Sequence, residues 1–353
     1  MGMSVRMRIQ GQRIATLVVV LWGLLPLVTH AQSMNSTEQA IFKYLEARQT
    51  VFTIPINTSS SQVLEAEIKV AMARDPYLNL DVGRWTFTLR SSLLANSATI
   101  QVNYLENAAQ YAAVVRGVHQ VLKTIIKPGM DVYAKEKAIH DYVVLHTAYD
   151  TSLQNGTAYD ALYKQSATCQ GYAMLTYQLL KAAKIPNILI TGTATNSQGT
   201  ASHAWNEVDL NGKWYQLDTT WDDPVPNVPG QVMYDYFNLT TAQMARNHHW
   251  NAANLPVANT NYIQVLEASK NPQDHAILKS AALFVETASD TFTNMRKLQT
   301  SLANVTSGHT YSFRIPYKDT PQLSSLILPY QAQFSYVRDA RNPNYALVTM
   351  TMQ

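Results

Sequence analysis

The sequence predicts a mixed α+β fold, on the basis of two recurring patterns. Segments with apolar residues three and four positions apart, typical of helices, occur beside short segments in which every second residue is apolar, typical of strands. The clearest strand pair, SHAWNEVDLNGKWYQLDTTW, is interrupted by Asn211–Gly212, a dipeptide that favours a two-residue hairpin turn. Helices and an antiparallel sheet are therefore expected, and the hydrophobic content of 46% is ample for a core.

The first 31 residues are expected to be a signal peptide rather than part of the fold. Arg6, Arg8 and Arg13 make a positively charged region before the apolar stretch IATLVVVLWGLLPLV, and THAQS offers a cleavage site after Ala31. A retained membrane anchor is the alternative, but Pro26 and the polar run after the cleavage site favour removal. No later stretch is long and apolar enough to span a bilayer. We therefore expect a secreted or cell-surface protein without stable membrane insertion after cleavage.

Three sections are expected after the signal peptide. Residues 35–106 combine helix patterns with alternating strands and predict a small N-terminal α+β section, in which Ser36 caps the first helix. Residues 107–260 hold two long helix patterns, a helix that begins at a cysteine, and the hairpin, and are expected to form the catalytic core. Residues 261–353 contain further helix and strand patterns and predict a C-terminal α/β section.

Composition excludes several classes of partner. The net charge is +3 and only 14% of residues are charged, without a basic run, so we expect no nucleic-acid partner. No acidic loop has calcium-binding spacing, and the adjacent pair His248–His249 is a weak metal motif on its own. We therefore expect no metal and no cofactor. The sequence carries no indication of an oligomeric state.

Cys169 is the only cysteine, so the chain can form no internal disulfide. Its thiol is a buried apolar group, a bridge to another chain, or a reactive group. It begins the helix pattern CQGYAMLTYQLLKAAKIP, with Thr168 as the expected cap. Free amides and the positive end of the dipole at a helix start favour the thiolate, the nucleophilic form. Gly171, a poor helix former, indicates that something packs closely against this first turn.

His203 lies on the first strand of the predicted hairpin. If Asn211–Gly212 form the turn, the pairing places two carboxylates, Asp218 and Asp222, diagonally next to His203 on the same face. Either carboxylate would then be close enough to hydrogen-bond the imidazole. The register alone leaves both open, and an isolated histidine beside Trp205 is more often structural than catalytic.

Three motifs now appear in order: Cys-x-Gly-Tyr-Ala from Cys169, His-Ala-Trp-Asn from His203, and Asp-x-Thr-Trp-Asp from Asp218. Together they resemble the transglutaminase-like superfamily. The resemblance spans about 130–250, and this part of the chain is also similar to bacterial, exported members of the superfamily. It implies a papain-like core, with a catalytic helix packed on an antiparallel sheet and flanked by small α+β or β-rich sections. It also implies that Cys169 is the nucleophile, that His203 is the base, and that Asp218 rather than Asp222 orients the base.

The resemblance implies acyl transfer through a thioester at Cys169. A Gln carboxamide would be the acyl donor, and an amine, which gives protein cross-links, or water would be the acceptor. The expected partner is therefore a protein or peptide with an exposed Gln and an amine donor. A cysteine peptidase or amidase on the same fold, and a non-catalytic cell-surface binding module, are the alternatives.

Four further residues are expected to bind substrate or to support the oxyanion. They are Trp205, Tyr172, Gly171 and Asn206. The backbone N–H of Cys169 is the expected oxyanion donor, because it lies at the start of a helix.

Overall fold

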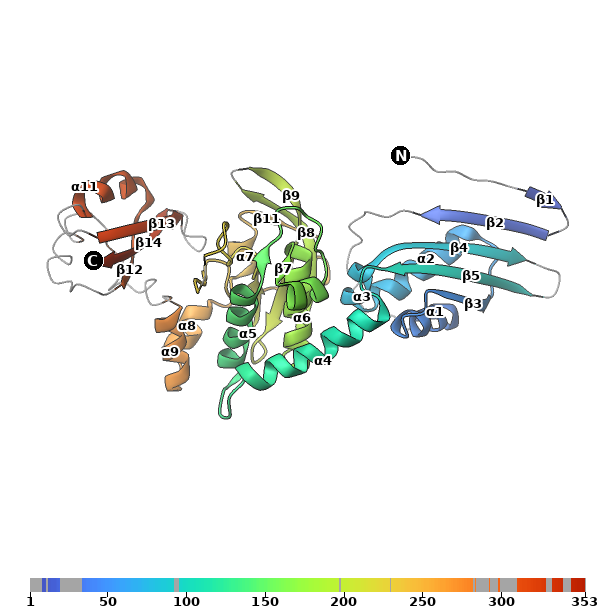
Figure 1. Cartoon of the computed structure of the whole chain (residues 1–353), viewed down its shortest axis with the longest axis horizontal. Coiled ribbons are helices and arrows are strands. Elements are labelled where there is room, and N and C mark those ends of the chain that lie inside the picture. Colours follow the sequence, from blue (N-terminus) through green and yellow to red (C-terminus); the bar gives the residue numbers. More distant parts are fainter. Residues whose placement is uncertain are drawn as a thin grey trace. The chain divides into compact units, whose positions relative to one another are not determined.

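A computed structural model gives the fold of the chain (Figure 1). It describes residues 8–10, 12–19, 34–91, 95–196, 198–228, 230–281, 283, 292, 298, 310–327, 332–338 and 344–352. The chain divides into two compact units. The first comprises Met1–Thr124, His146–Asn206 and His248–Pro256, and the second comprises Ile125–Leu145, Glu207–Asn247 and Val257–Gln353. Helices and antiparallel sheets occur together in this fold, which confirms the predicted α+β class. The section boundaries at 107 and 261 stay predictions.

The first unit contains most of the elements that surround the cysteine. Its helices are α1 (Ser36–Glu46), α2 (Ser61–Ala73), α3 (Pro76–Asp81), α4 (Ala108–Ile125), the π-helix η1 (Asp160–Lys164) and α6 (Cys169–Ala182). Its strands are β1 (Arg8–Gln10), β2 (Gln12–Val19), β3 (Val51–Ile56), β4 (Val82–Ser91), β5 (Asn96–Tyr104), β6 (Ala148–Tyr149), β7 (Ser166–Ala167), β8 (Asn187–Asn196), β9 (Gly199–Asp209) and β11 (His248–His249). Strand β9 continues from the first unit into the second.

The N-terminal section is an antiparallel sheet with helices against one face (Figure 1). The strand order is β1-β2-β4-β5-β3. Every second residue of β3 is buried, as expected when one face meets a core and the other does not. Ile41 of α1 and Leu64 of α2 pack in one buried cluster with Phe52 and Ile100 from the strands. The small α+β section predicted for residues 35–106 therefore has a core of its own.

The first helix begins one residue earlier than predicted. Asn35, rather than Ser36, is the N-cap of α1. Its side chain accepts a hydrogen bond from the N–H of Glu38 at 2.9 Å, and the Glu38 carboxylate accepts one from the Asn35 N–H at 2.8 Å. This reciprocal pair is a capping box, in which asparagine serves as well as serine.

Most of the predicted signal peptide lies outside the described residues. Of residues 1–31, the structure describes the backbone of β1 and β2, and β2 pairs antiparallel with β4, with Val19 opposite Trp85. Among the helices in the described part of the chain, none has the length and apolar character needed to cross a membrane. The signal peptide stays a prediction.

The predicted hairpin is present in the central sheet. Asn211 and Gly212 both have positive φ, 59° and 79°, as a two-residue hairpin turn requires. Leu210 and Lys213 exchange both backbone hydrogen bonds, at 2.9 and 3.4 Å. The turn therefore joins β9 to β10 (Trp214–Leu217) in the predicted register. The strand order of this sheet is β10-β9-β8-β11.

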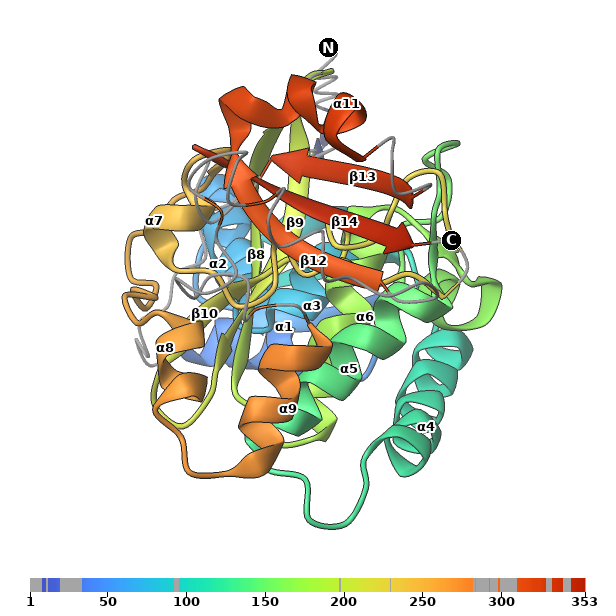
Figure 2. The same ribbon diagram turned by 90° about the vertical axis from the view of Figure 1, so that its left-hand side faces the viewer.

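The second unit contains the remaining elements. Its helices are α5 (Val132–His146), α7 (Thr241–Met244), α8 (Tyr262–Glu267), α9 (Pro272–Ser280), the 3-10 helix η3 (Tyr317–Gln322) and α11 (Leu323–Ile327). Besides β10, its strands are β12 (Thr310–Pro316), β13 (Ala332–Arg338) and β14 (Tyr345–Met352). Figure 2 shows β14 between β12 and β13, both of which pair with it antiparallel.

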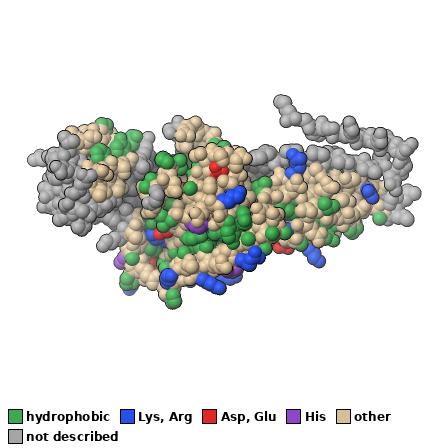
Figure 3. Space-filling model, viewed as in Figure 1, with side chains coloured by type: hydrophobic (Ala, Val, Ile, Leu, Met, Phe, Trp, Pro, Cys, Tyr) green, Lys and Arg blue, Asp and Glu red, His purple; other side chains and the backbone are tan. Residues whose placement is uncertain are grey.

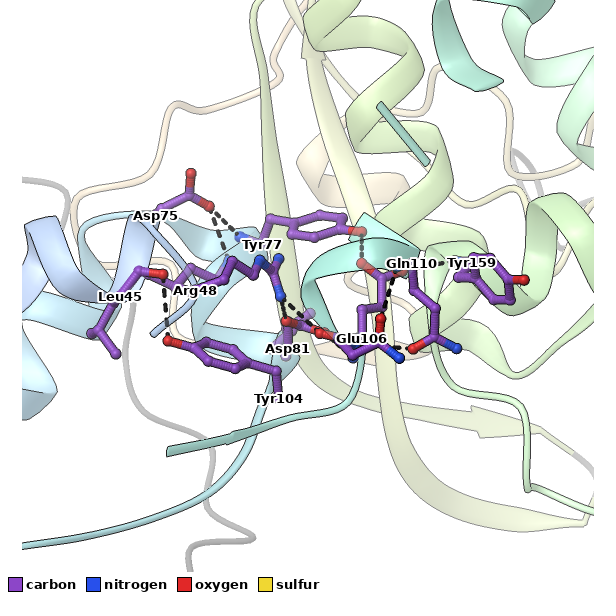
Figure 4. Close-up of polar contacts among 12 residues, drawn as sticks. Leu45, Arg48, Asp75, Tyr77, Asp81, Tyr104, Glu106, Gln110 and Tyr159 are labelled. Atoms are coloured by element: carbon purple, nitrogen blue, oxygen red, sulfur yellow. Dashed lines mark hydrogen bonds and ion pairs between the residues drawn. The ribbon is translucent and has the colours of Figure 1, made fainter. Parts of the chain in front are cut away.

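Glu106 lies in a buried polar cluster just after β5 (Figure 4). Its carboxylate accepts hydrogen bonds from the Tyr77 hydroxyl at 2.6 Å and from the backbone N–H of Tyr159 at 2.7 Å. Its own N–H donates to Asp81, which pairs with Arg48. Burial raises the pKa of Glu106 to about 7, against the hydrogen bond from Tyr77, which lowers it. A buried carboxyl thus joins the N-terminal section to residue 159.

This cluster predicts that stability falls as the pH rises. The folded protein holds the Glu106 proton more tightly than the unfolded chain, so the stabilisation is complete below about pH 4.5 and is lost as the pH rises through about 7. We expect Glu106→Gln to raise the free energy of unfolding by about 2–3 kcal/mol at pH 8 and to change it little at pH 5. Urea unfolding of both proteins between these pH values measures the difference. A difference that does not vary with pH would contradict the prediction.

Candidate active site

Cys169 is the first residue of α6, as predicted, and its free thiol is partly exposed. Thr168 occupies the N-cap position with extended backbone, but its side chain makes no capping hydrogen bond, in contrast to the expectation. The remainder of α6 from Gly171 to Leu180 is buried. The helix therefore presents its thiol at an end where no Thr168 oxygen competes for the first-turn amides, which suits these amides for binding an anion.

The residues before Cys169 are held by a tightly bonded loop. The Asp150 carboxylate accepts hydrogen bonds from the Ser152 hydroxyl at 2.6 Å and from the N–H groups of Ser152, Gln154 and Asn155 at 2.8–2.9 Å. These bonds, above all that of the Ser152 hydroxyl, lower the pKa of Asp150 to about 2. The carbonyl of Asn155 in turn accepts the Thr168 N–H at 2.7 Å. The loop thus fixes the backbone that positions the thiol.

Gly171 is required by close packing beneath the first turn of α6. A Cβ at this position would lie 2.6 Å from the Cβ of Ala167 and 2.8 Å from the carbonyl oxygen of Thr157. Both distances are shorter than real contacts allow, and one partner is backbone. The close packing against the first turn of α6 that Gly171 predicted is confirmed, and the residues that pack there are Thr157 and Ala167.

Replacing Gly171 with alanine is expected to destabilise the protein by about 2–4 kcal/mol, because the clash outweighs the better helix propensity of alanine. The Gly171→Ala protein that does fold should also lose activity, because the first turn of α6 must shift to make room for the added Cβ. Thermal unfolding and activity measure the two effects. Gly156→Ala is the matched control, because its Cβ would meet only the Thr168 hydroxyl at 3.8 Å. Equal behaviour of the two variants would refute the packing role.

His203 lies on β9, with its side chain 8% exposed. Its ring stacks on Trp205, with centroids 5.9 Å apart, and lies 5.2 Å from the ring of His248. Three residues along the strand, Asn206 donates its side-chain N–H to the carbonyl of Ala173 in α6 at 3.1 Å. This buried bond ties the histidine strand to the cysteine helix.

The four residues expected to bind substrate or support the oxyanion make contacts within the fold, and their predicted roles stay predictions. Tyr172 is fully buried and donates its hydroxyl to the Thr147 carbonyl at 2.8 Å. Trp205 is 1% exposed and packs edge-on against Trp250. Gly171 and Asn206 make the helix contacts already described.

Asp218 follows β10 and is fully buried. One carboxylate oxygen, Oδ1, accepts the N–H groups of Thr220 at 3.0 Å and Trp221 at 3.2 Å. Its own N–H donates to the carbonyl of Tyr236 at 3.1 Å. The loop that follows β10 therefore holds the backbone of Asp218 and one of its carboxylate oxygens in place.

Asp222, the rival carboxylate, has other partners. Its Oδ2 lies 3.1 Å from Nε2 of His140, and its Oδ1 accepts the N–H of Tyr236 at 2.8 Å. Because both oxygens are engaged within the second unit, Asp222 is poorly suited to orient His203. The contact with His140 thus separates Asp222 from Asp218, whereas the hairpin register allowed either carboxylate to orient His203.

His203 and His248 lie beside each other in the first unit, with ring centroids 5.2 Å apart. Imidazole groups suit proton transfer, and they are also ligands that zinc accepts. His248 is buried on β11 whereas His249 is exposed, so only one member of the adjacent pair lies beside His203. That the protein binds no metal stays a prediction.

Sequence reasoning missed Asp150 and His140. The Asp-x-Ser pattern at 150–152, typical of a turn in which the side chain binds nearby backbone, could have indicated the first. The second residue, His140, has no comparable local signal. Its partner Asp222 lies 82 positions away, and no local pattern joins them.

Comparisons with known proteins agree with the geometry. Residues 119–219 match the transglutaminase-like superfamily. Over 147 residues, 37% of this chain, the sequence is 25% identical to kyphoscoliosis peptidase of Mus musculus and 26% identical to that of Homo sapiens. The match covers 22% of each relative, so the chain spans about a fifth of the length of these curated relatives.

One solved structure, of a TGase, is similar at a TM-score of 0.29 and 17% identity, over 48% of this chain and 49% of that chain. The family match includes the motifs that begin at Cys169 and His203 and the first two residues of the third motif, Asp218 and Thr219. Residues 119–219 are therefore a transglutaminase-like core, as the motifs around Cys169, His203 and Asp218 predict.

Proposed function

We propose that this protein is an exported cysteine acyltransferase of the transglutaminase type. Cys169 would be the nucleophile, His203 the general base and Asp218 the group that orients it. The observation that carries the proposal is the position of Cys169, the sole cysteine, at the uncapped start of a buried helix. A structural thiol needs no such position, whereas a nucleophile gains both its thiolate and an oxyanion site from it.

In the first half-reaction, His203 takes the proton of the Cys169 thiol, and the thiolate attacks the carbonyl carbon of a Gln carboxamide. The backbone N–H of Cys169 donates to the oxyanion that forms. The C–N bond then breaks, His203 returns its proton to the leaving ammonia, and a thioester remains on the sulfur. Asp218 stabilises the imidazolium throughout.

In the second half-reaction, His203 takes a proton from an incoming amine, whose nitrogen attacks the thioester and displaces the thiolate. The product is an isopeptide cross-link. Water in place of the amine gives hydrolysis, and the name of the relatives, kyphoscoliosis peptidase, favours this second candidate. Both candidates share the thioester and differ only in the acceptor.

The proposed substrate is a surface or extracellular protein with exposed Gln and amine groups, because the leader would export the enzyme from a bacterium. Lys and Arg form small separate groups on the face seen in Figure 3, which supports a protein rather than a nucleic acid as partner. Expression of the full chain, with mass analysis of the secreted product, tests export. A product that begins at Gln32 supports it, and a retained N-terminus opposes it.

The activity test uses the purified mature protein beside its Cys169→Ala variant. Each is incubated with a Gln-containing protein and a tagged primary amine, and the products are read by intact mass and peptide mapping. A tag on Gln that requires Cys169 supports transamidation. Cysteine-dependent cleavage or deamidation without the tag makes water the acceptor.

Two controls complete this test. EDTA is expected to leave the activity unchanged, because no step requires a metal, and a loss of activity would point to a metal site that involves the adjacent rings of His203 and His248. No product of any kind, together with slow alkylation of Cys169, would overturn the proposal in favour of a binding module.

A further inference from the structure

A second buried histidine lies in contact with two carboxylates in the second unit. His140, on α5, is fully buried. Its Nε2 lies 3.1 Å from Asp222 Oδ2, and its Nδ1 lies 3.1 Å from Asp141 Oδ1. Since each carboxylate accepts hydrogen bonds, both ring nitrogens act as donors only if the ring is an imidazolium.

The groups around His140 favour this charged form. Burial by itself lowers the pKa of the imidazole, but the hydrogen bonds to Asp141 and Asp222 outweigh it and raise the pKa to about 9. Lys137 and the Tyr234 hydroxyl bind Asp141 at 2.5 and 2.9 Å, and burial raises the pKa of Glu136, one helical turn earlier, to about 8. The ring also packs between Tyr234 and Phe237, at 5.3 and 4.7 Å between centroids.

Asp222 connects this cation to the loop that carries Asp218. The N–H of Asp222 donates to the carbonyl of Asp218 at 3.3 Å. The backbone of Tyr236 binds both residues, because its carbonyl accepts the Asp218 N–H and its N–H donates to the Asp222 carboxylate. His140 therefore supplies the positive charge for a turn that otherwise holds two fully buried carboxylates.

We propose that His140 is a positioning residue, whose imidazolium neutralises Asp222 and thereby holds the turn from Asp218 to Asp222 in the shape that aims Asp218. The inference rests on the proposed role of Asp218. Without the cation, Asp222 must take up a proton or leave its buried site, and either change loosens the turn that orients Asp218.

The first test does not depend on any activity. Imidazole ¹⁵N spectra of the full-length protein are recorded from pH 6 to 10, with His140→Gln to assign the signal. We expect the His140 ring to remain doubly protonated at pH 7.5 and to lose its proton only near pH 9. A neutral His140 at pH 7.5 overturns the inference, even if the enzyme transfers acyl groups as proposed.

The second test is a double-mutant cycle on kcat and KM. His140→Gln and Asp222→Asn are each expected to lower kcat by about 10- to 100-fold with KM unchanged, and the double variant should be no worse than either single variant. His119→Gln, on an exposed position of α4, is the matched control and should retain full activity. Effects that multiply in the double variant, or that appear in KM alone, would overturn the inference.

If His140→Gln fails to fold, Asp222→Asn carries the test, since it leaves His140 bonded to Asp141. Its ¹⁵N spectrum should then show the His140 pKa lowered by the loss of one carboxylate. An unshifted titration in this variant would show that Asp222 and His140 do not form the proposed pair. Failure of the wild-type enzyme in the acyl-transfer assay, with an imidazolium at His140, would instead count against the proposed function.

Discussion

Cys169→Ala is expected to abolish acyl transfer, with a fall in kcat/KM of at least about 10⁴-fold. The thiol forms the covalent intermediate, so no other group can replace it. Its side chain is small and partly exposed, so the melting temperature should change little. Steady-state kinetics and thermal unfolding measure both quantities on the same preparations.

The chain itself supplies a clean control for this variant. Because Cys169 is the sole cysteine, iodoacetamide can add mass only to this thiol, and the alanine variant should gain none. Gly156→Ala, whose added Cβ would make only an ordinary contact with the Thr168 hydroxyl, should keep both activity and alkylation. Retained activity in Cys169→Ala would place the nucleophile elsewhere and refute the assignment.

Asp218→Asn is expected to reduce kcat by about 10³- to 10⁴-fold, with KM nearly unchanged. An amide cannot stabilise the imidazolium of His203 and favours the wrong tautomer of the ring. Its side-chain oxygen can still accept the N–H groups of Thr220 and Trp221, so the loop should keep its shape. The loss therefore reports on charge and orientation rather than on folding.

The matched variant is Asp222→Asn, which removes the rival carboxylate. We expect its loss in kcat to be at least tenfold smaller, because Asp222 acts through the turn and not on the base. Kinetics of the two variants beside the wild type, with near-ultraviolet circular dichroism to confirm the fold, provide the comparison. A larger loss of kcat for Asp222→Asn than for Asp218→Asn would mean that Asp222, and not Asp218, orients His203.

Local patterns predicted the parts of the site that depend on backbone geometry. Asn211–Gly212 tolerate positive φ, and this property alone fixed the hairpin turn and its register. The start of α6 at Cys169 followed from the helical spacing of the residues after it, and Gly171 indicated a close contact. Asn35 was missed as a cap because Ser36, the next residue, satisfies the same preference.

By itself, the sequence determined where helix α6 and the hairpin turn begin and which strands form the hairpin, and it predicted which residues carry the catalytic groups. Only the tertiary structure decided how the buried carboxyl groups find their partners: Asp222 with His140, and Glu106 with Tyr77. The physical reason is range. Turns and helix starts depend on the conformational preferences of adjacent residues, whereas the energy of a buried charge depends on partners that the fold brings from distant positions.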